Sequence, residues 1–251
     1  MKAFYTSVKM EAKLFMRGFF GPFFAFIFPL MMLVLFGSIY GNEPSAFFGG
    51  HGAMDVSIPA YAAMVIGVCG LMSLPLSISE YRDRKIYKRF DATPVGKERV
   101  LWAQLFVNIV ASIVGIMLLF LFGAILYKVK LAGNMAAVFL AVILSMAAIF
   151  SLGFFLASVA RDAKVTNILC YSLYFIMLFT SGATIPKALF SDSIVRFSKV
   201  LPLTYVVELL QGTVAGEAVS GYWLSIVVLS GVSIVLGAVS FAIYKRKRWE
   251  G

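Results

Sequence analysis

The side chains best able to bind or react gather in one stretch, residues 80–99, which reads EYRDRKIYKRFDATPVGKER. It holds seven basic and four acidic residues, whereas long apolar runs flank it on both sides. Charges at this density can set the register and orientation of a partner. We therefore interpret the stretch as a connector that joins two membrane spans outside the lipid.

The spacing within this connector predicts a helix over about residues 81–90. At about 100° per residue, Ile86, Tyr87 and Phe90 fall on one arc and most basic side chains on the opposite arc. Pro94 ends the helix because it has no N–H group, and Gly96 lets the chain turn. Such a helix could take force from another protein. A plain cytoplasmic loop, or a basic helix lying on anionic lipid, also fits the pattern.

The composition indicates a membrane protein. Hydrophobic residues make up 61% of the chain and charged residues 14%, against about 25% charged in an average soluble domain. We expect an all-α integral membrane protein with the lipid bilayer as a partner. The net charge of +10 could suggest nucleic acid, but the basic residues cluster at the ends of apolar runs, where membrane topology needs them. No nucleic-acid partner is expected.

Six apolar runs are long enough to cross a bilayer, which takes about 20 residues. The predicted spans cover about residues 19–40, 57–79, 100–127, 135–160, 165–181 (or from Ala163) and 222–244. Residues 1–18 alternate apolar and basic side chains, which predicts a helix in the membrane interface. Residues 182–221 predict two short helices that dip into the outer leaflet, because neither piece is long enough to cross. Residues 1–251 then form a single transmembrane domain.

The basic residues also predict the orientation. With the N-terminus inside, the inside segments carry 17 Lys and Arg residues and the outside loops carry five, which is a clear positive-inside bias. Both termini and residues 80–99 are therefore expected in the cytosol. The expected location is a cell membrane, of prokaryotic type, crossed several times.

The predicted spans lack the groups that coupled carriers and membrane enzymes use. None has Asp, Glu, Lys, Arg or His in its interior, which disfavours a proton- or ion-coupled carrier. Paired carboxylates, a Ser/His set, metal-ligand spacing and a GxxxxGK[ST] loop are missing too, so we expect no catalytic residue, metal or cofactor in this chain. Cys69 and Cys170 lie in apolar spans and predict reduced thiols.

Mildly polar side chains concentrate in the fifth predicted span. One interpretation is that they form hydrogen bonds between helices. The other is that they line a weakly polar, aromatic path for an amphipathic substrate. The residues of that path would be Asn167, Tyr171, Tyr174, Thr180 and Ser181.

Two motifs in this six-span layout resemble the permease subunits of ABC-2 type transporters. In residues 77–105, Glu80 closes the second span, a short basic helix follows, and Thr93-Pro94 opens the third. In residues 181–212, Ser181-Gly182 and a later Pro-Leu-Thr-Tyr run follow the fifth span. One departure is the tetrad at residues 84–87, Arg-Lys-Ile-Tyr, where family members often carry Gly-Thr with acidic residues.

The resemblance implies an exporter of amphipathic substrates such as drugs, antibiotics, peptides or lipids. Such permeases are not enzymes themselves and work in pairs, as homodimers or heterodimers. Each copy binds a separate cytosolic ATPase subunit, which holds the ATP and Mg²⁺ and receives the short cytoplasmic helix, the coupling helix, in a groove. The implied ATPase-docking residues are Glu80, Arg82, Asp83, Lys85, Ile86, Tyr87, Arg89 and Phe90. The implied outer gate consists of Pro186, Pro202, Thr204 and Tyr205.

Two other functions fit the layout. A secondary carrier would depend on a proton gradient rather than on ATP. A non-transporting scaffold or sensor would recruit a cytosolic partner through the same helix, and the turnover of a bound ATPase would then ignore every candidate substrate.

Overall fold

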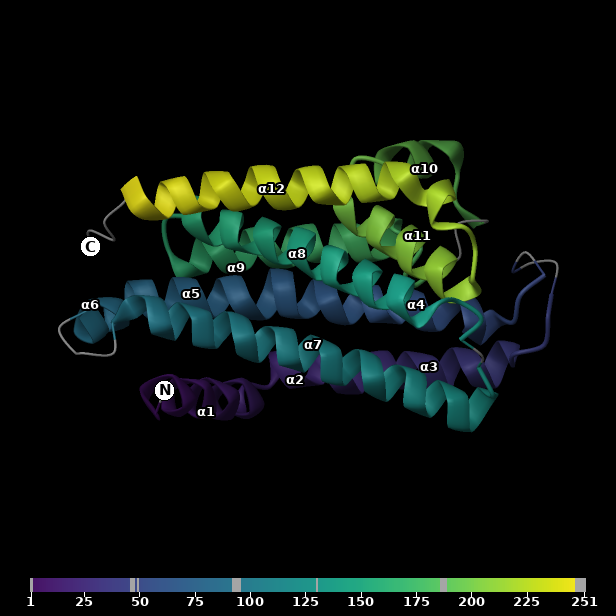
Figure 1. Cartoon of the computed structure of the whole chain (residues 1–251), viewed down its shortest axis with the longest axis horizontal. Helices are drawn as coiled ribbons and strands as arrows, with labels where there is room; N and C mark the ends of the chain where they lie inside the picture. The colour runs from purple at the N-terminus through teal and green to yellow at the C-terminus, as the bar shows by residue number, and fades with distance from the viewer. Residues whose placement is uncertain are drawn as a thin grey trace.

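Figure 1 shows a bundle of long helices, in a computed structural model that describes residues 2–45, 48, 50–91, 96–129, 131–185 and 189–246. Among these residues the regular structure is helical, apart from one isolated bridge between Pro44 and Gly52. The all-α fold class predicted from the sequence is confirmed.

Among the described residues, six helical segments are long and apolar enough to cross a membrane, as predicted. Three of them are the single helices α7 (Lys97–Tyr127), α8 (Met135–Val159) and α9 (Ala163–Thr180). The last is α12 (Trp223–Arg246), which a short 3-10 turn, η5 (Val219–Tyr222), precedes. The fifth span begins at Ala163, the earlier of its two expected starts.

The first two spans each combine α-helical and π-helical turns. The first consists of α2 (Phe20–Pro22), η1 (Phe23–Ile27) and α3 (Phe28–Tyr40), and the second of α4 (Ala53–Gly67), η3 (Val68–Ser73) and α5 (Leu74–Asp83). Each π segment ends two residues before a proline, Pro29 or Pro75. A proline offers no N–H to the carbonyl four residues earlier and its ring crowds that carbonyl, which explains the widened turns.

The second span is the centre of the bundle. Every residue from Ile58 to Met72 is buried, and the span packs against α3, α7, α8 and α11 (Pro202–Ala215). It approaches α8 closely, since a Cβ atom added to Gly153 would overlap the carbonyl oxygen of Gly70. Small residues at such a contact let two helix backbones touch.

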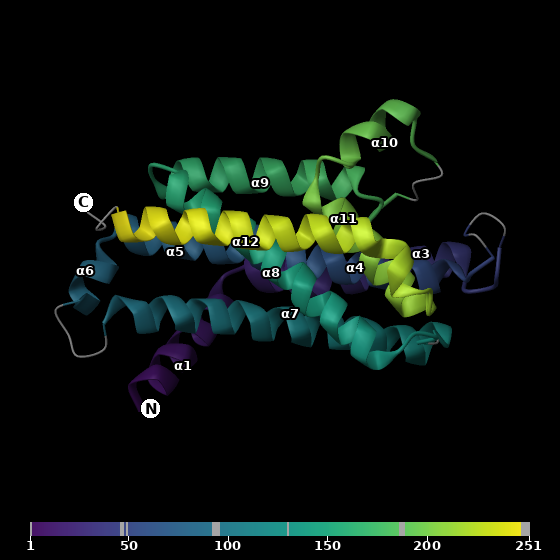
Figure 2. The ribbon, with the colours of Figure 1, turned by 45° about the horizontal axis from the view of Figure 1, so that its top comes forward.

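The predicted accessory helices are present. Figure 2 shows α1 (Lys2–Arg17) leaving the bundle at an angle next to α7, with which it packs. Between the last two spans lie α10 (Asp192–Ser198) and α11, and α11 is buried among α4, α8 and α12. Two short helices in this segment are therefore confirmed, whereas their position in the outer leaflet stays a prediction.

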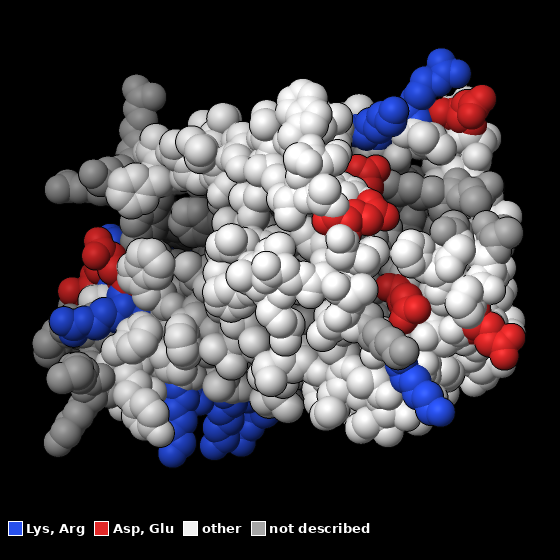
Figure 3. All heavy atoms as spheres, turned by 45° about the vertical axis from the view of Figure 1, so that its right-hand side comes forward, with Lys and Arg blue, Asp and Glu red and all other residues white. Residues whose placement is uncertain are grey.

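The two ends of the bundle differ. The start of α1, the end of α12 and the short helix α6 (Ile86–Asp91) lie at one end, and α10 lies at the other (Figure 1). We call the first of these the α6 end. On the face seen in Figure 3, a belt without charged side chains lies between the charged groups of the left-hand part and those of the right-hand part. Such a belt is what lipid-facing surface requires.

The continuous helix predicted over residues 81–90 is wrong. α5 ends at Asp83, and α6 starts only at Ile86. Between them Lys85 adopts a left-handed backbone conformation, with φ of 56°. A right-handed helix cannot pass through such a residue, so the chain turns at this point and α6 folds against α7.

Candidate functional site

The candidate functional site is the place where α5 turns into α6, residues 80–91, which we call the α5–α6 corner. It contains all eight residues predicted to dock an ATPase. The structure divides them into side chains that hold the corner in place and side chains on its outer surface.

The end of α5 is bound to the connection between α8 and α9. Arg82 donates a 2.7 Å hydrogen bond from Nη1 to the carbonyl oxygen of Ala157 in α8. The Asp83 carboxylate accepts a 2.6 Å bond from the backbone N–H of Ala163, the first residue of α9. A carboxylate at this position also favours the positive end of the helix dipole. Both residues therefore fix the corner to neighbouring spans.

A chain of tyrosines binds the corner to α1 and α7. The Tyr87 hydroxyl in α6 donates a 2.8 Å hydrogen bond to Oε1 of Gln104 in α7. The ring of Tyr87 lies 5.7 Å from the ring of Tyr81 in α5, and the Tyr81 hydroxyl donates a 2.7 Å bond to Oε1 of Glu11 in α1. Only 3% of Tyr87 is exposed. Tyr87, which was predicted to dock an ATPase, therefore does not lie on the outer surface of the corner, because the turn at Lys85 directs α6 and this ring against α7.

Glu11 is a buried carboxylate that the sequence reasoning missed. It is 5% exposed and forms no ion pair among the described residues. Burial raises its pKa to about 7, although the Tyr81 and Gln104 side chains counteract part of the rise. Nε2 of Gln104 is itself buried and makes no hydrogen bond of good geometry. The available signal was that Glu11 is the one acidic residue among the first 42.

The outer surface of the corner is basic. Arg84, Lys85, Lys88 and Arg89 are exposed, and Ile86 and Phe90 are half-buried beside them. The Asp91 carboxylate pairs with Lys97 at 2.8 Å, which closes α6 onto the start of α7. Of the eight predicted docking residues, Lys85, Ile86, Arg89 and Phe90 lie on this surface. Ile86 also borders, together with Glu80, a cavity inside the corner. Pro94 lies outside the described residues.

The structure does not bring the five predicted path residues into one hollow. Tyr174 and Ser181 are buried in the bundle, and Asn167, Tyr171 and Thr180 are half-buried. Only Tyr171 borders one of the two cavities described here. The substrate path along the fifth span stays a prediction.

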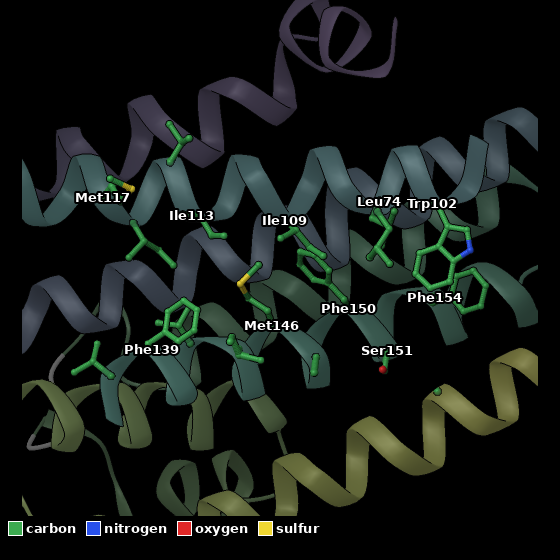
Figure 4. A pocket seen from close by; sticks show the side chains of 18 of the residues that line it. Leu74, Trp102, Ile109, Ile113, Met117, Phe139, Met146, Phe150, Ser151 and Phe154 are labelled. Carbon is green, nitrogen blue, oxygen red and sulfur yellow. The ribbon is translucent and has the colours of Figure 1, made fainter. Parts of the chain in front are cut away.

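The larger hollow is an apolar groove of about 1600 Å³ between α7 and α8, which reaches α12. In Figure 4, Ile109, Ile113 and Met117 of α7 lie opposite Phe139 and Met146 of α8. Its one charged lining residue is Glu98, near the start of α7. Sequence reasoning could not find this groove, because apolar side chains that line a groove and those that face lipid follow the same pattern.

The predicted gate residues make the α10–α11 corner rigid. The Thr204 hydroxyl donates a 2.7 Å hydrogen bond to the carbonyl of Ser198, and the Tyr205 hydroxyl donates one of the same length to the carbonyl of Lys199. Pro202 is the first residue of α11, where a missing N–H costs nothing. Pro186 lies outside the described residues.

Six candidate spans, a structured connector after the second and two short helices before the sixth are the layout of a polytopic membrane protein. The profile of the ABC-2 type transporter family matches residues 2–215. The chain therefore belongs to this family, as its motifs predicted, and is the transmembrane permease component of an ABC transporter. Permeases of the family generally work with an ATPase subunit and are generally not catalytic themselves. A comparison with curated proteins found no match.

Proposed function

We propose that this chain is the membrane subunit of an ATP-driven exporter of amphipathic substrates, and that the α5–α6 corner is where the ATPase docks. The ATPase would hold the ATP and Mg²⁺. The α6 end of the bundle would face the cytosol, and two copies of this chain, or this chain and a related permease, would form the membrane part.

The observation that carries this proposal is the set of side-chain bonds at the corner. Arg82, Asp83, Tyr81 and Tyr87 connect it to α8, α9, α1 and α7. A displacement of α6 must therefore move the ends of several spans together, whereas a flexible loop would absorb it. Hydrogen bonds to charged groups contribute about 1.5–3 kcal/mol each, which is enough to hold the corner during a conformational cycle.

The exposed charges of the corner indicate the kind of partner surface. Arg84, Lys85, Lys88 and Arg89 would complement an acidic groove on the ATPase. Ile86 and Phe90, half-buried at the same place, would add apolar contact area. Compared with the docking set expected from the sequence, this proposed surface adds Arg84 and Lys88 and leaves out Glu80, Arg82, Asp83 and Tyr87.

The experiment is a charge reversal on the corner surface. The double variant Arg89→Glu/Phe90→Asp is co-expressed with the ABC ATPases of the same genome, and co-purification of the ATPase is measured. We expect at least a tenfold loss of bound ATPase, with normal membrane insertion. The control is Arg196→Glu in α10, which makes the same Arg-to-Glu reversal at the other end of the bundle and should retain the ATPase. Normal co-purification with the corner variant would contradict the proposal.

A further inference from the structure

The inside of the α5–α6 corner contains a second hollow, a partly open cavity of about 420 Å³ between α1, α2, α5, α7 and α9. This volume is in the range of small-molecule sites. Two carboxylates border it, Glu11 of α1 and Glu80 of α5, together with one exposed basic residue, Arg84. Neither carboxylate forms an ion pair among the described residues.

Two buried amides in the cavity wall have unused hydrogen-bonding capacity. Gln104 is 1% exposed and Asn108 is 3% exposed. Oδ1 of Asn108 has no hydrogen-bond partner, and Nε2 of Gln104, next to Glu11, makes no hydrogen bond of good geometry, although the other atom of each amide is bonded. Buried polar atoms are normally paired in a folded protein. In a cavity wall, such atoms are available to a polar or charged group that enters the cavity.

The remainder of the wall is apolar and aromatic. The rings that border the cavity are those of Phe15, Phe19, Phe20, Tyr81 and Tyr171. Aromatic faces attract organic cations, and the Glu11 carboxylate beside them supplies the opposite charge when it is ionised. An anionic ligand would instead meet two carboxylates.

We propose that this cavity binds the cationic group of an amphipathic organic cation. The Glu11 carboxylate and the Asn108 amide oxygen would face the positive charge, and the rings of α1 and α2 would cover the apolar part. The proposed binding does not depend on whether the ligand is also transported. That the ligand is carried across the membrane rests on the proposed exporter function.

The test uses two ions of the same size and shape but opposite charge, tetraphenylphosphonium and tetraphenylborate. The full chain is placed in lipid nanodiscs without any ATPase, and equilibrium dialysis against empty nanodiscs gives the saturable binding. We expect saturable binding of tetraphenylphosphonium, and at least tenfold weaker binding of tetraphenylborate.

The variants test the site itself. Glu11→Gln keeps the shape and an acceptor for Tyr81 but removes the charge, and it should weaken tetraphenylphosphonium binding at least tenfold. Asn108→Leu removes an unpaired acceptor with little risk to folding, and it should weaken binding several-fold. The matched control is Glu98→Gln, an acid near the same end of the bundle that borders the other hollow, which should bind normally.

Three results would overturn the inference: no saturable binding by the unmodified chain, equal binding of the two ions, or unchanged binding by both site variants. Because no ATPase is present, failure here is separate from failure of the docking experiment.

Discussion

At the scale of single residues, Glu11 has the least ordinary environment. It is buried in the wall of a cavity, with one hydrogen bond from Tyr81 and no ion pair among the described residues. Burial without a counter-ion favours the neutral form, which is why its pKa rises to about 7. The residue is therefore poised to change charge near neutral pH.

This raised pKa predicts a pH-dependent stability. The folded chain keeps the Glu11 proton up to about pH 7, whereas the unfolded chain loses it near the ordinary value of 4.5. The folded state therefore binds more protons in this interval, and the free energy of unfolding falls as pH rises, by up to about 3 kcal/mol. Above the pKa of Glu11 in the folded chain, both states have lost the proton, and the free energy of unfolding falls no further through this group. The midpoint of thermal unfolding is measured at pH 5, 6, 7 and 8. As the pH rises, the midpoint of Glu11→Gln should increase relative to that of the unmodified chain. Parallel curves for the two proteins would contradict this.

The residue scale also shows where sequence reasoning fails. Lys85 is not a residue type that favours left-handed backbone, so the helical spacing of Ile86, Tyr87 and Phe90 continued through it and predicted one helix. The burial of Tyr87 follows from that turn and from Gln104, which is 17 residues away in sequence. A contact between residues so far apart in sequence cannot be predicted from the local spacing of residue types.

At the scale of elements, the spans were predictable because length and apolar composition alone define them. The second span shows the limit of that argument. It is four residues longer at each end than predicted, since Asp55 and the last turn of α5 are polar enough to interrupt an apolar run but continue the helix. The closeness of α8 to the second span was not predictable, because it depends on two glycines in different helices.

This close contact predicts a sensitive position. In Gly153→Ala, the new Cβ would overlap the Gly70 carbonyl oxygen, and overpacking of this kind typically costs about 1–3 kcal/mol. The matched control is Gly231→Ala in α12, where a Cβ atom would meet nothing within 4 Å. Thermal unfolding should show a lower midpoint for Gly153→Ala and an unchanged or higher one for the control. Equal midpoints would mean that α8 and the second span are not packed this closely.

At the scale of the whole molecule, the two ends of the bundle differ in structure. The α6 end carries the start of α1, the end of α12 and a basic corner, and the opposite end carries α10 and the rigid start of α11 (Figure 1). The second span runs between the two ends and touches most of the bundle. A displacement of α6 can therefore be transmitted to α11 through the second span. The orientation predicted from the basic residues would place that displacement in the cytosol.

The most direct test of this account is a distance measurement along the bundle. Spin labels are attached at Lys88→Cys in α6 and Val200→Cys next to α11, both exposed positions. The native Cys69 and Cys170 are buried and should remain unlabelled. The distance distribution is compared between the nucleotide-free complex and the complex trapped with ATP. We predict a shift on ATP trapping that disappears in the Arg89→Glu/Phe90→Asp background. An unchanged distribution in a complex that keeps its ATPase and hydrolyses ATP would contradict the claim that the α5–α6 corner transmits the nucleotide cycle to the spans.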